Sequence, residues 1–192
     1  MRWRSSVCAA SLLLALASPA TGEDAADAGP RLELPAHRAL HRGLEEAGRQ
    51  LAPFTTDGCS GGMSSVWEGL SGVFPEFADL HGVTPPWEAC CITHDAAYHA
   101  GGTQADARAS LAARLRADED LRACVEADGV ARRGEMAARY DTSEARVDSA
   151  YAAIAQAMYL AVRLGGAPCS GLPWRWGYGA PQCIVTPRDF RD

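Results

Sequence analysis

Residues 90–98 read CCITHDAAY, and this stretch decides the fold. It places two cysteines and two ionisable side chains within about two turns of a helix. Each helical residue is rotated by about 100° from the one before it, so residues four apart point to nearly the same side. Cys90 therefore shares a face with His94, and Cys91 shares another face with Asp95. A disulfide from each cysteine would bring a different segment of the chain beside each ionisable group.

Local signals predict that residues 87–100 form a helix and that a second helix returns alongside it. Thr84 is placed to cap the first helix, and prolines at the next two positions favour a helix start. Two glycines at 101–102 end that helix. The second helix is expected over 103–127 and is ended by the Asp-Gly pair at 128–129. Because the connection is short, we expect the two helices to be antiparallel.

Apolar residues at spacings of three and four predict two further helices. The first covers 36–51 and carries His37 and His41, which we expect on its solvated face. The second covers 143–164, with a buried stripe made of Val147, Tyr151, Ile154, Met158 and Val162. No alternating strand pattern is present, so the predicted fold class is mostly α.

Residues 1–20 have the three parts of a signal peptide, namely a positive leader, an apolar run and small residues before a cleavage site (2–4, 7–17 and 18–20). The apolar run is too short to span a bilayer, which needs about 20 apolar residues, so no transmembrane anchor is expected. We therefore expect a secreted or periplasmic protein. Residues 21–35 are acidic and have no apolar face, and we expect a disordered lead-in there, followed by one folded domain over 36–192.

Removal of the signal peptide leaves six cysteines, which in an exported chain favour a disulfide framework over a thiol or zinc site. They are Cys59, Cys90, Cys91, Cys124, Cys169 and Cys183. Six cysteines allow many pairings, and spacing alone does not choose among them. The last two lie in a tail at 167–192 that is rich in proline and glycine, and we expect them to pair there.

The charge of the chain excludes one class of partner. It has 18 basic and 24 acidic residues, which gives a formal net charge of −6 at pH 7. An acidic protein is repelled by a phosphate backbone, so nucleic acid is not an expected partner. The chain has no lysine and no basic cluster, so we do not expect strong attraction to anionic lipid surfaces either.

The block at 90–98 resembles the active-site helix of the secreted phospholipases A2, in which two cysteines precede a His-Asp pair and a tyrosine follows three residues later. A glycine-rich turn at 55–62, TTDGCSGG, precedes it, which is also similar to that family. The resemblance covers about residues 55–125. By this resemblance the chain is a divergent bacterial member of the family, with an insertion at 63–86.

The resemblance implies two disulfides, Cys59 to Cys91 and Cys90 to Cys124. The implied fold is a disulfide-stapled antiparallel helix pair of phospholipase A2 type. Additional helices and an irregular C-terminal tail complete a phospholipase A2-like domain over 36–192.

The resemblance also implies two candidate catalytic residues, with His94 as the base and an aspartate on the second helix as its partner. In the family this aspartate lies six residues before the bridging cysteine, which here selects Asp118. Helical face arithmetic alone would prefer Asp120, four residues before that cysteine. The family has a further disulfide beside this aspartate, and both matching positions, Ala97 and Ala117, are alanine here. Because both cysteine positions of that disulfide are replaced together, the alignment of the two helices that selects Asp118 is supported.

A calcium (Ca2+) site made of oxygen atoms, the ligands that calcium prefers, is a further implication of the resemblance. Its ligands would be the backbone carbonyls of Gly58, Ser60 and Gly62 and the carboxylate of Asp95. One turn after His94, Tyr98 is open to two interpretations, a hydrogen bond to Asp118 or simple core packing.

The implied reaction is calcium-dependent hydrolysis of the sn-2 acyl ester of a glycerophospholipid at a membrane or micelle interface. A neutral histidine accepts a proton from water near neutral pH, and the water then attacks the ester. No serine or cysteine nucleophile is needed. The alternative is a catalytically inactive secreted binding module on the same scaffold, which would use its aromatic loops to grip a protein or a lipid.

Overall fold

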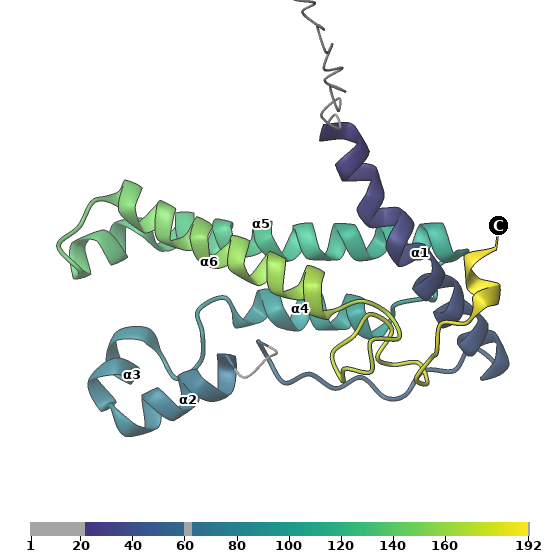
Figure 1. The fold of residues 1–192 in the computed structure, drawn as a ribbon. Coiled ribbons are helices and arrows are strands. Elements are labelled where there is room, and N and C mark those ends of the chain that lie inside the picture. The colour runs from purple at the N-terminus through teal and green to yellow at the C-terminus, as the bar shows by residue number, and fades with distance from the viewer. Residues whose placement is uncertain (1–21, 60–62, 192) are drawn as a thin grey trace, which may run out of the picture.

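The structure, a computed structural model, describes residues 22–59 and 63–191 (Figure 1). These residues form six α-helices and one short 3-10 helix, and no β-strand occurs among them. The helices are α1 (Gly22–Glu46), α2 (Met63–Val73), α3 (Pro75–His81), α4 (Glu88–His99), α5 (Ala107–Arg139), α6 (Glu144–Gly165) and η1 (Pro187–Phe190). The predicted mostly α fold class is therefore confirmed.

Helices α4 and α5 form the central pair and lie side by side (Figure 1). The helix predicted over 87–100 is confirmed as α4. Thr84 does not cap it, because Trp87 occupies the N-cap position and no side-chain cap bond is made. The N-cap of α5 is Asp106, whose side chain accepts a hydrogen bond from the backbone N–H of Ala109 at 2.8 Å.

Helix α5 continues to Arg139 and passes through the Asp-Gly pair at 128–129, where the sequence predicted a helix end. The reason is the packing of α5 against α6. A Cβ atom on residue 129 would lie 2.4 Å from Cγ of Tyr151, so only glycine lets the two helices approach this closely. Gly129 is a packing residue inside a helix, and the prediction of a helix end there is wrong.

Helix α6 confirms the helix predicted over 143–164, and Ser143 is its N-cap. Three residues of the predicted stripe are buried, namely Val147, Tyr151 and Met158. The other two, Ile154 and Val162, are only partly buried. Together α5 and α6 form a long helical hairpin (Figure 1).

Helix α1 begins at Gly22, so the disordered lead-in predicted over 21–35 is wrong where the structure describes it. Charge holds this part of the chain, because the Glu33 carboxylate pairs with Arg114 of α5 and Arg163 of α6. Apolar periodicity does not reveal a helix that is held in this way. The predicted signal peptide lies outside the described residues, and no helix inside them is long and apolar enough to cross a membrane.

His37 and His41 are buried, so the prediction that they lie on a solvated face is wrong. His37 Nδ1 lies 2.8 Å from Oγ of Ser110 on α5. Trp176 of the C-terminal tail donates a hydrogen bond from Nε1 to the same oxygen at 3.0 Å. The tail covers this face of α1, and a contact so distant in sequence leaves no local signal.

The segment between the glycine turn and α4 forms a small hairpin of α2 and α3 that projects from the main helices (Figure 1). Trp67 of α2 packs edge-to-face on Trp87, with ring centroids 5.8 Å apart, and this contact anchors the hairpin. The C-terminal tail is irregular, as predicted, and is closed by the disulfide between Cys169 and Cys183.

Candidate active site

Two disulfides tie the candidate site together, and their pairing is the one that the resemblance implied. Cys90 is joined to Cys124, with Cα atoms 5.8 Å apart, and this bond holds α5 against one face of α4. Cys59 is joined to Cys91, with Cα atoms 5.0 Å apart, and this bond holds the glycine turn against another face. The two faces of α4 therefore have different neighbours, as helical rotation predicts.

His94 and Asp118 form a hydrogen-bonded pair between α4 and α5. The distance from His94 Nε2 to Asp118 Oδ1 is 3.0 Å. Asp118 is completely buried and His94 is 7% exposed. A carboxylate only accepts hydrogen bonds, so Nε2 carries the proton and donates it. The second ring nitrogen, Nδ1, is then the basic one, and no hydrogen-bond partner from the described residues occupies it.

The register argument selected the aspartate that the structure pairs with His94. Asp120, the choice favoured by face arithmetic alone, is exposed. Ala97 and Ala117 border the same small cavity of about 70 Å³ beside His94. They belong to the same apolar cluster, so they lie near each other, as the register that selects Asp118 predicts.

Tyr98 fulfils both interpretations that the sequence left open. Its hydroxyl donates a hydrogen bond to Asp118 Oδ1 at 2.7 Å. Its ring is buried, with its centroid 4.1 Å from that of His94. Burial, together with the charge of Asp118, raises the pKa of Tyr98 well above its usual value. The hydroxyl therefore keeps its proton and remains a donor.

Two arginines that sequence reasoning missed lie on the other side of Asp118. Arg163 of α6 donates from Nη1 to Asp118 Oδ2 at 2.9 Å, and Arg114 Nε lies 4.0 Å from the same oxygen. Arg114 Nε also donates to the Tyr98 hydroxyl at 3.2 Å. Glu33 of α1 bridges the two guanidinium groups, with one carboxylate oxygen on each.

The sequence carried only a partial signal for this cluster. Arg114 lies four residues before Asp118, which places both on one face of a helix. Arg163 is a charged residue next to the last position of an apolar stripe. Neither belongs to a motif, and a chain with 18 basic residues gives no reason to single them out.

Glu33 is strongly favoured as a carboxylate. Burial alone would raise its pKa, but contact with His37 and the charges of Arg114 and Arg163 lower the pKa of Glu33 from 4.5 to about 2. With Asp118, the cluster has two guanidinium groups and two carboxylates, so it is neutral overall.

Asp95 lies on a different face of α4, beside the glycine turn. It is buried, and its Oδ2 accepts a hydrogen bond from the Thr56 hydroxyl at 2.6 Å. Gly58 has a φ of 73°, and a Cβ atom there would lie 2.5 Å from a carboxylate oxygen of Glu88. The turn therefore requires glycine at this position.

The predicted calcium ligands are only partly described by the structure. Asp95 and Gly58 are linked through Thr56, whose hydroxyl also accepts a hydrogen bond from the Gly58 N–H at 3.1 Å. Ser60 and Gly62 lie outside the described residues. In the part of the chain that the structure describes, no three His, Cys, Asp or Glu side chains gather into a metal site. Of the predicted ligands the structure describes Asp95 and Gly58, and carboxylate and carbonyl oxygens are the donors that calcium prefers.

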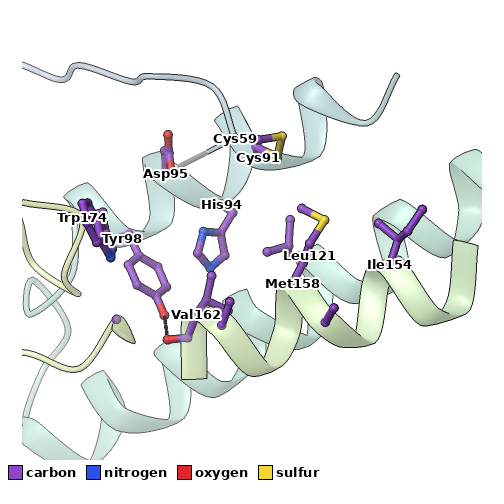
Figure 2. A pocket seen from close by; sticks show the side chains of 13 residues that line it. Cys59, Cys91, His94, Asp95, Tyr98, Leu121, Ile154, Met158, Val162 and Trp174 are labelled. Atoms are coloured by element: carbon purple, nitrogen blue, oxygen red, sulfur yellow. Dashed lines mark hydrogen bonds between the residues drawn. A yellow bond between two sulfur atoms is a disulfide. The ribbon is translucent and has the colours of Figure 1, made fainter. Parts of the chain in front are cut away.

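A cavity of about 300 Å³ lies beside His94, between α4 and α6 (Figure 2). The side chains that reach it from α5, α6 and the C-terminal tail include Leu121, Ile154, Met158, Val162 and Trp174. Two alanines, Ala157 and Ala161, also line the α6 wall and leave room within it. A cavity with such apolar walls suits an apolar ligand.

A second cavity of about 290 Å³ lies beside the first and has a more polar lining. Asp57 and Tyr178 belong to it, and Asp95 and Trp174 border both cavities. Burial and the charges of Asp95 and Asp57 raise the pKa of Tyr178 to about 12. The predicted calcium ligand on α4 therefore lies where an apolar cavity meets a polar one.

Comparisons with known proteins assign no family to the chain. No protein-family model matches it, and no curated protein or solved structure is significantly similar to it. The resemblance to secreted phospholipases A2 therefore stays a prediction, and a proposal of function rests on the chain's own residues and their geometry.

Proposed function

We propose that the protein hydrolyses the sn-2 acyl ester of glycerophospholipids in a calcium-dependent reaction outside the cytoplasm. The observation that carries this proposal is the His94–Asp118 pair beside an apolar cavity. A histidine with one nitrogen fixed by a buried carboxylate and the other available to accept a proton has the features of a general base. The three disulfides support the compartment, because such bonds persist in oxidising environments.

The proton transfers follow from the hydrogen bonds of His94. Its Nδ1 takes a proton from a water molecule as the water oxygen attacks the ester carbonyl carbon. Asp118 keeps the ring in the tautomer that leaves Nδ1 basic, and it stabilises the imidazolium that forms. When the bond to the glycerol oxygen breaks, His94 returns the proton to that oxygen. The products are a fatty acid and a lysophospholipid.

Asp95 and the backbone carbonyl of Gly58 would hold the calcium ion, together with the predicted carbonyls of Ser60 and Gly62. When bound, calcium polarises the ester carbonyl and neutralises the developing oxyanion, which is worth several kcal/mol. Thr56 orients the Asp95 carboxylate through its 2.6 Å hydrogen bond.

The two adjoining cavities suit the two parts of a phospholipid. The apolar cavity offers an acyl chain the side chains of α6, including Ile154, Met158 and Val162. The more polar cavity lies on the side of Asp95 and Tyr178, where a phosphate and its head group would extend. The ester of such a lipid joins its apolar part to its polar part, and Asp95 lies at the corresponding boundary between the cavities.

The direct test is the release of fatty acid from phosphatidylcholine micelles by the purified protein with its disulfides intact. We expect activity that a calcium chelator abolishes and that falls by about 10²- to 10⁴-fold in His94→Gln. His81→Gln is the matched control, because His81 lies on α3 and does not line the cavity. If the wild-type protein shows no turnover with calcium, the enzyme proposal is refuted and the binding module, whose binding would survive His94→Gln, is favoured.

Calcium binding is tested separately by thermal unfolding. A calcium concentration of about 100 times the Kd stabilises the folded state by about 2.7 kcal/mol and so raises Tm. Asp95→Asn should abolish this shift. Asp79→Asn, which changes an exposed carboxylate on α3, should keep it. A shift of full size in Asp95→Asn would refute the ligand assignment.

A further inference from the structure

The carboxylate of Asp118 is held from both sides. His94 and Tyr98 engage one oxygen, Oδ1, at 3.0 and 2.7 Å. Arg163 engages the other, Oδ2, at 2.9 Å. The three donors fix the plane of the carboxylate as well as its position. Without such donors the plane is soft, because rotation about the Cβ–Cγ bond of aspartate has only a broad preference.

Arg163 is itself held by α1. Its Nη2 pairs with one oxygen of Glu33, and Arg114 pairs with the other oxygen. Arg114 is completely buried, and its Nη2 donates to the backbone carbonyls of Val162 and Arg163 at 2.9 and 3.0 Å. The side chains of Glu33 and Arg163 are 18% and 16% exposed. A chain of ion pairs with little exposure to solvent therefore runs from α1 through α6 to Asp118.

We propose that Arg163 is a positioning residue for the His94–Asp118 pair and that Glu33 holds Arg163 in place. This inference rests on the proposed function, because the position of a base affects turnover only if His94 acts as one. A buried carboxylate is costly unless it is paired and hydrogen-bonded, and Arg163 supplies both to Asp118. Helix α1 thereby belongs to the active centre, although it lies outside the stapled pair of α4 and α5.

Loss of Arg163 should lower kcat and leave KM nearly unchanged. Without Arg163, the nearest remaining cation to Asp118 Oδ2 is Arg114, at 4.0 Å. Rotation of the carboxylate toward Arg114 draws Oδ1 away from His94, so the tautomer and orientation of the base are no longer fixed and kcat falls. Arg163 does not line the apolar cavity, so its loss leaves KM nearly unchanged.

The kinetic test is a double-mutant cycle on phosphatidylcholine micelles with saturating calcium. Arg163→Met should lower kcat about 10- to 100-fold, with a change in KM of less than about twofold. Asp118→Asn lowers kcat by itself. In that background, Arg163→Met should change kcat by less than about twofold, because its effect acts through the carboxylate that has been removed.

Two further variants complete the series. Arg163→Lys keeps the charge, but an ammonium group does not engage two carboxylates as a planar fork does, so kcat should lie between those of the wild type and Arg163→Met. Arg146→Gln is the matched control, since Arg146 is exposed on the same helix, and it should keep full activity. If Arg163→Met fails to fold, Arg163→Lys carries the same test.

A second readout needs no turnover. The Nε2 proton of His94 gives an NMR resonance that is assigned by its absence in His94→Gln. It should shift in Arg163→Met and in Glu33→Gln, and it should stay in place in Arg146→Gln and Glu46→Gln. A shift without lipid hydrolysis by the wild type would refute the enzyme proposal and support the positioning of the pair.

Two results would overturn the inference. One is a resonance of His94 that does not move when Arg163 is replaced by Met or Lys. The other is a double variant of Arg163 and Asp118 whose loss of kcat equals the product of the two single losses. Independent losses of this kind indicate general damage to the fold.

Discussion

Acid should destabilise the protein through Glu33. Against the effect of burial, contact with His37 and the ion pairs with Arg114 and Arg163 lower the pKa of this carboxyl from 4.5 to about 2 in the folded chain. The difference, 4.5 minus about 2, corresponds to about 3 kcal/mol of unfolding free energy. Because the side chain is 18% exposed, solvent screens part of this interaction, and we expect about 2 kcal/mol.

The sign of the pH dependence follows from the lowered pKa. Above pH 4.5 the carboxylate is ionised in the folded and unfolded chains alike, and its whole contribution is present. As the pH falls from 4.5 toward 2, the unfolded chain takes up the proton first and the contribution declines. Glu33→Gln has no group to titrate here, so it should start less stable at neutral pH and lack this part of the decline.

The assay is denaturant unfolding followed by circular dichroism between pH 7 and pH 2, with the disulfides intact. The wild type should lose about 2 kcal/mol more than Glu33→Gln between pH 5 and pH 2. Glu46→Gln changes an exposed carboxylate on the same helix and should follow the wild type. Parallel curves for the wild type and Glu33→Gln would refute the reasoning and show that this carboxylate does not hold α1.

Three further substitutions test the packing, the hydrogen bond and the cavity. Gly129→Ala forces a Cβ atom against Tyr151 and should cost about 1–3 kcal/mol of stability, whereas Gly134→Ala, on the same helix with its nearest neighbour at 3.7 Å, should stabilise by about 0.5–1 kcal/mol. Thermal unfolding measures both, and equal Tm values would contradict the packing role. Tyr98→Phe removes one donor to the aspartate and should cost about 1 kcal/mol and lower kcat, so an unchanged kcat in the micelle assay would contradict its part in the site. Ala161→Phe fills the apolar cavity and should reduce turnover of long-chain lipids more than that of a soluble short-chain ester, while Ala150→Phe, exposed on α6, should affect neither. Equal losses on both substrates would show that the cavity does not hold the acyl chain.

The site on α4 could be predicted because its geometry is local. Two cysteines, His94 and Asp95 lie within about two helical turns, and the rotation of a helix assigns them to faces without reference to the rest of the fold. Asp118 lies on another helix, but one disulfide fixes the offset between the two helices. Counting helical faces from Cys124 would still have favoured Asp120, so the choice of Asp118 also needed the spacing that the resemblance implied and the matching alanines at 97 and 117.

The errors concern residues whose roles are tertiary. An Asp-Gly pair usually ends a helix, but at Gly129 the absent side chain makes room for Tyr151 of another helix. Glu33 lies in a stretch without an apolar face, and its partners Arg114 and Arg163 are 81 and 130 residues away. A periodicity argument examines one segment at a time, so it cannot detect a helix that is held by charges on two others.

Helix α6 connects the wall of the apolar cavity to the aspartate that pairs with His94. Val162 borders the apolar cavity, and the next residue, Arg163, donates to Asp118. Neighbouring residues of a helix point in directions about 100° apart, so Val162 can face the cavity while Arg163 faces Asp118. The three disulfides fix α4, α5, the glycine turn and the tail, but none includes α6, which is held by packing and by the ion pairs of Arg163. The pairing with Glu33 therefore holds the Arg163 end of α6 beside Asp118, and its loss should disturb the base while the packing of α6 on α5 keeps the cavity wall in place.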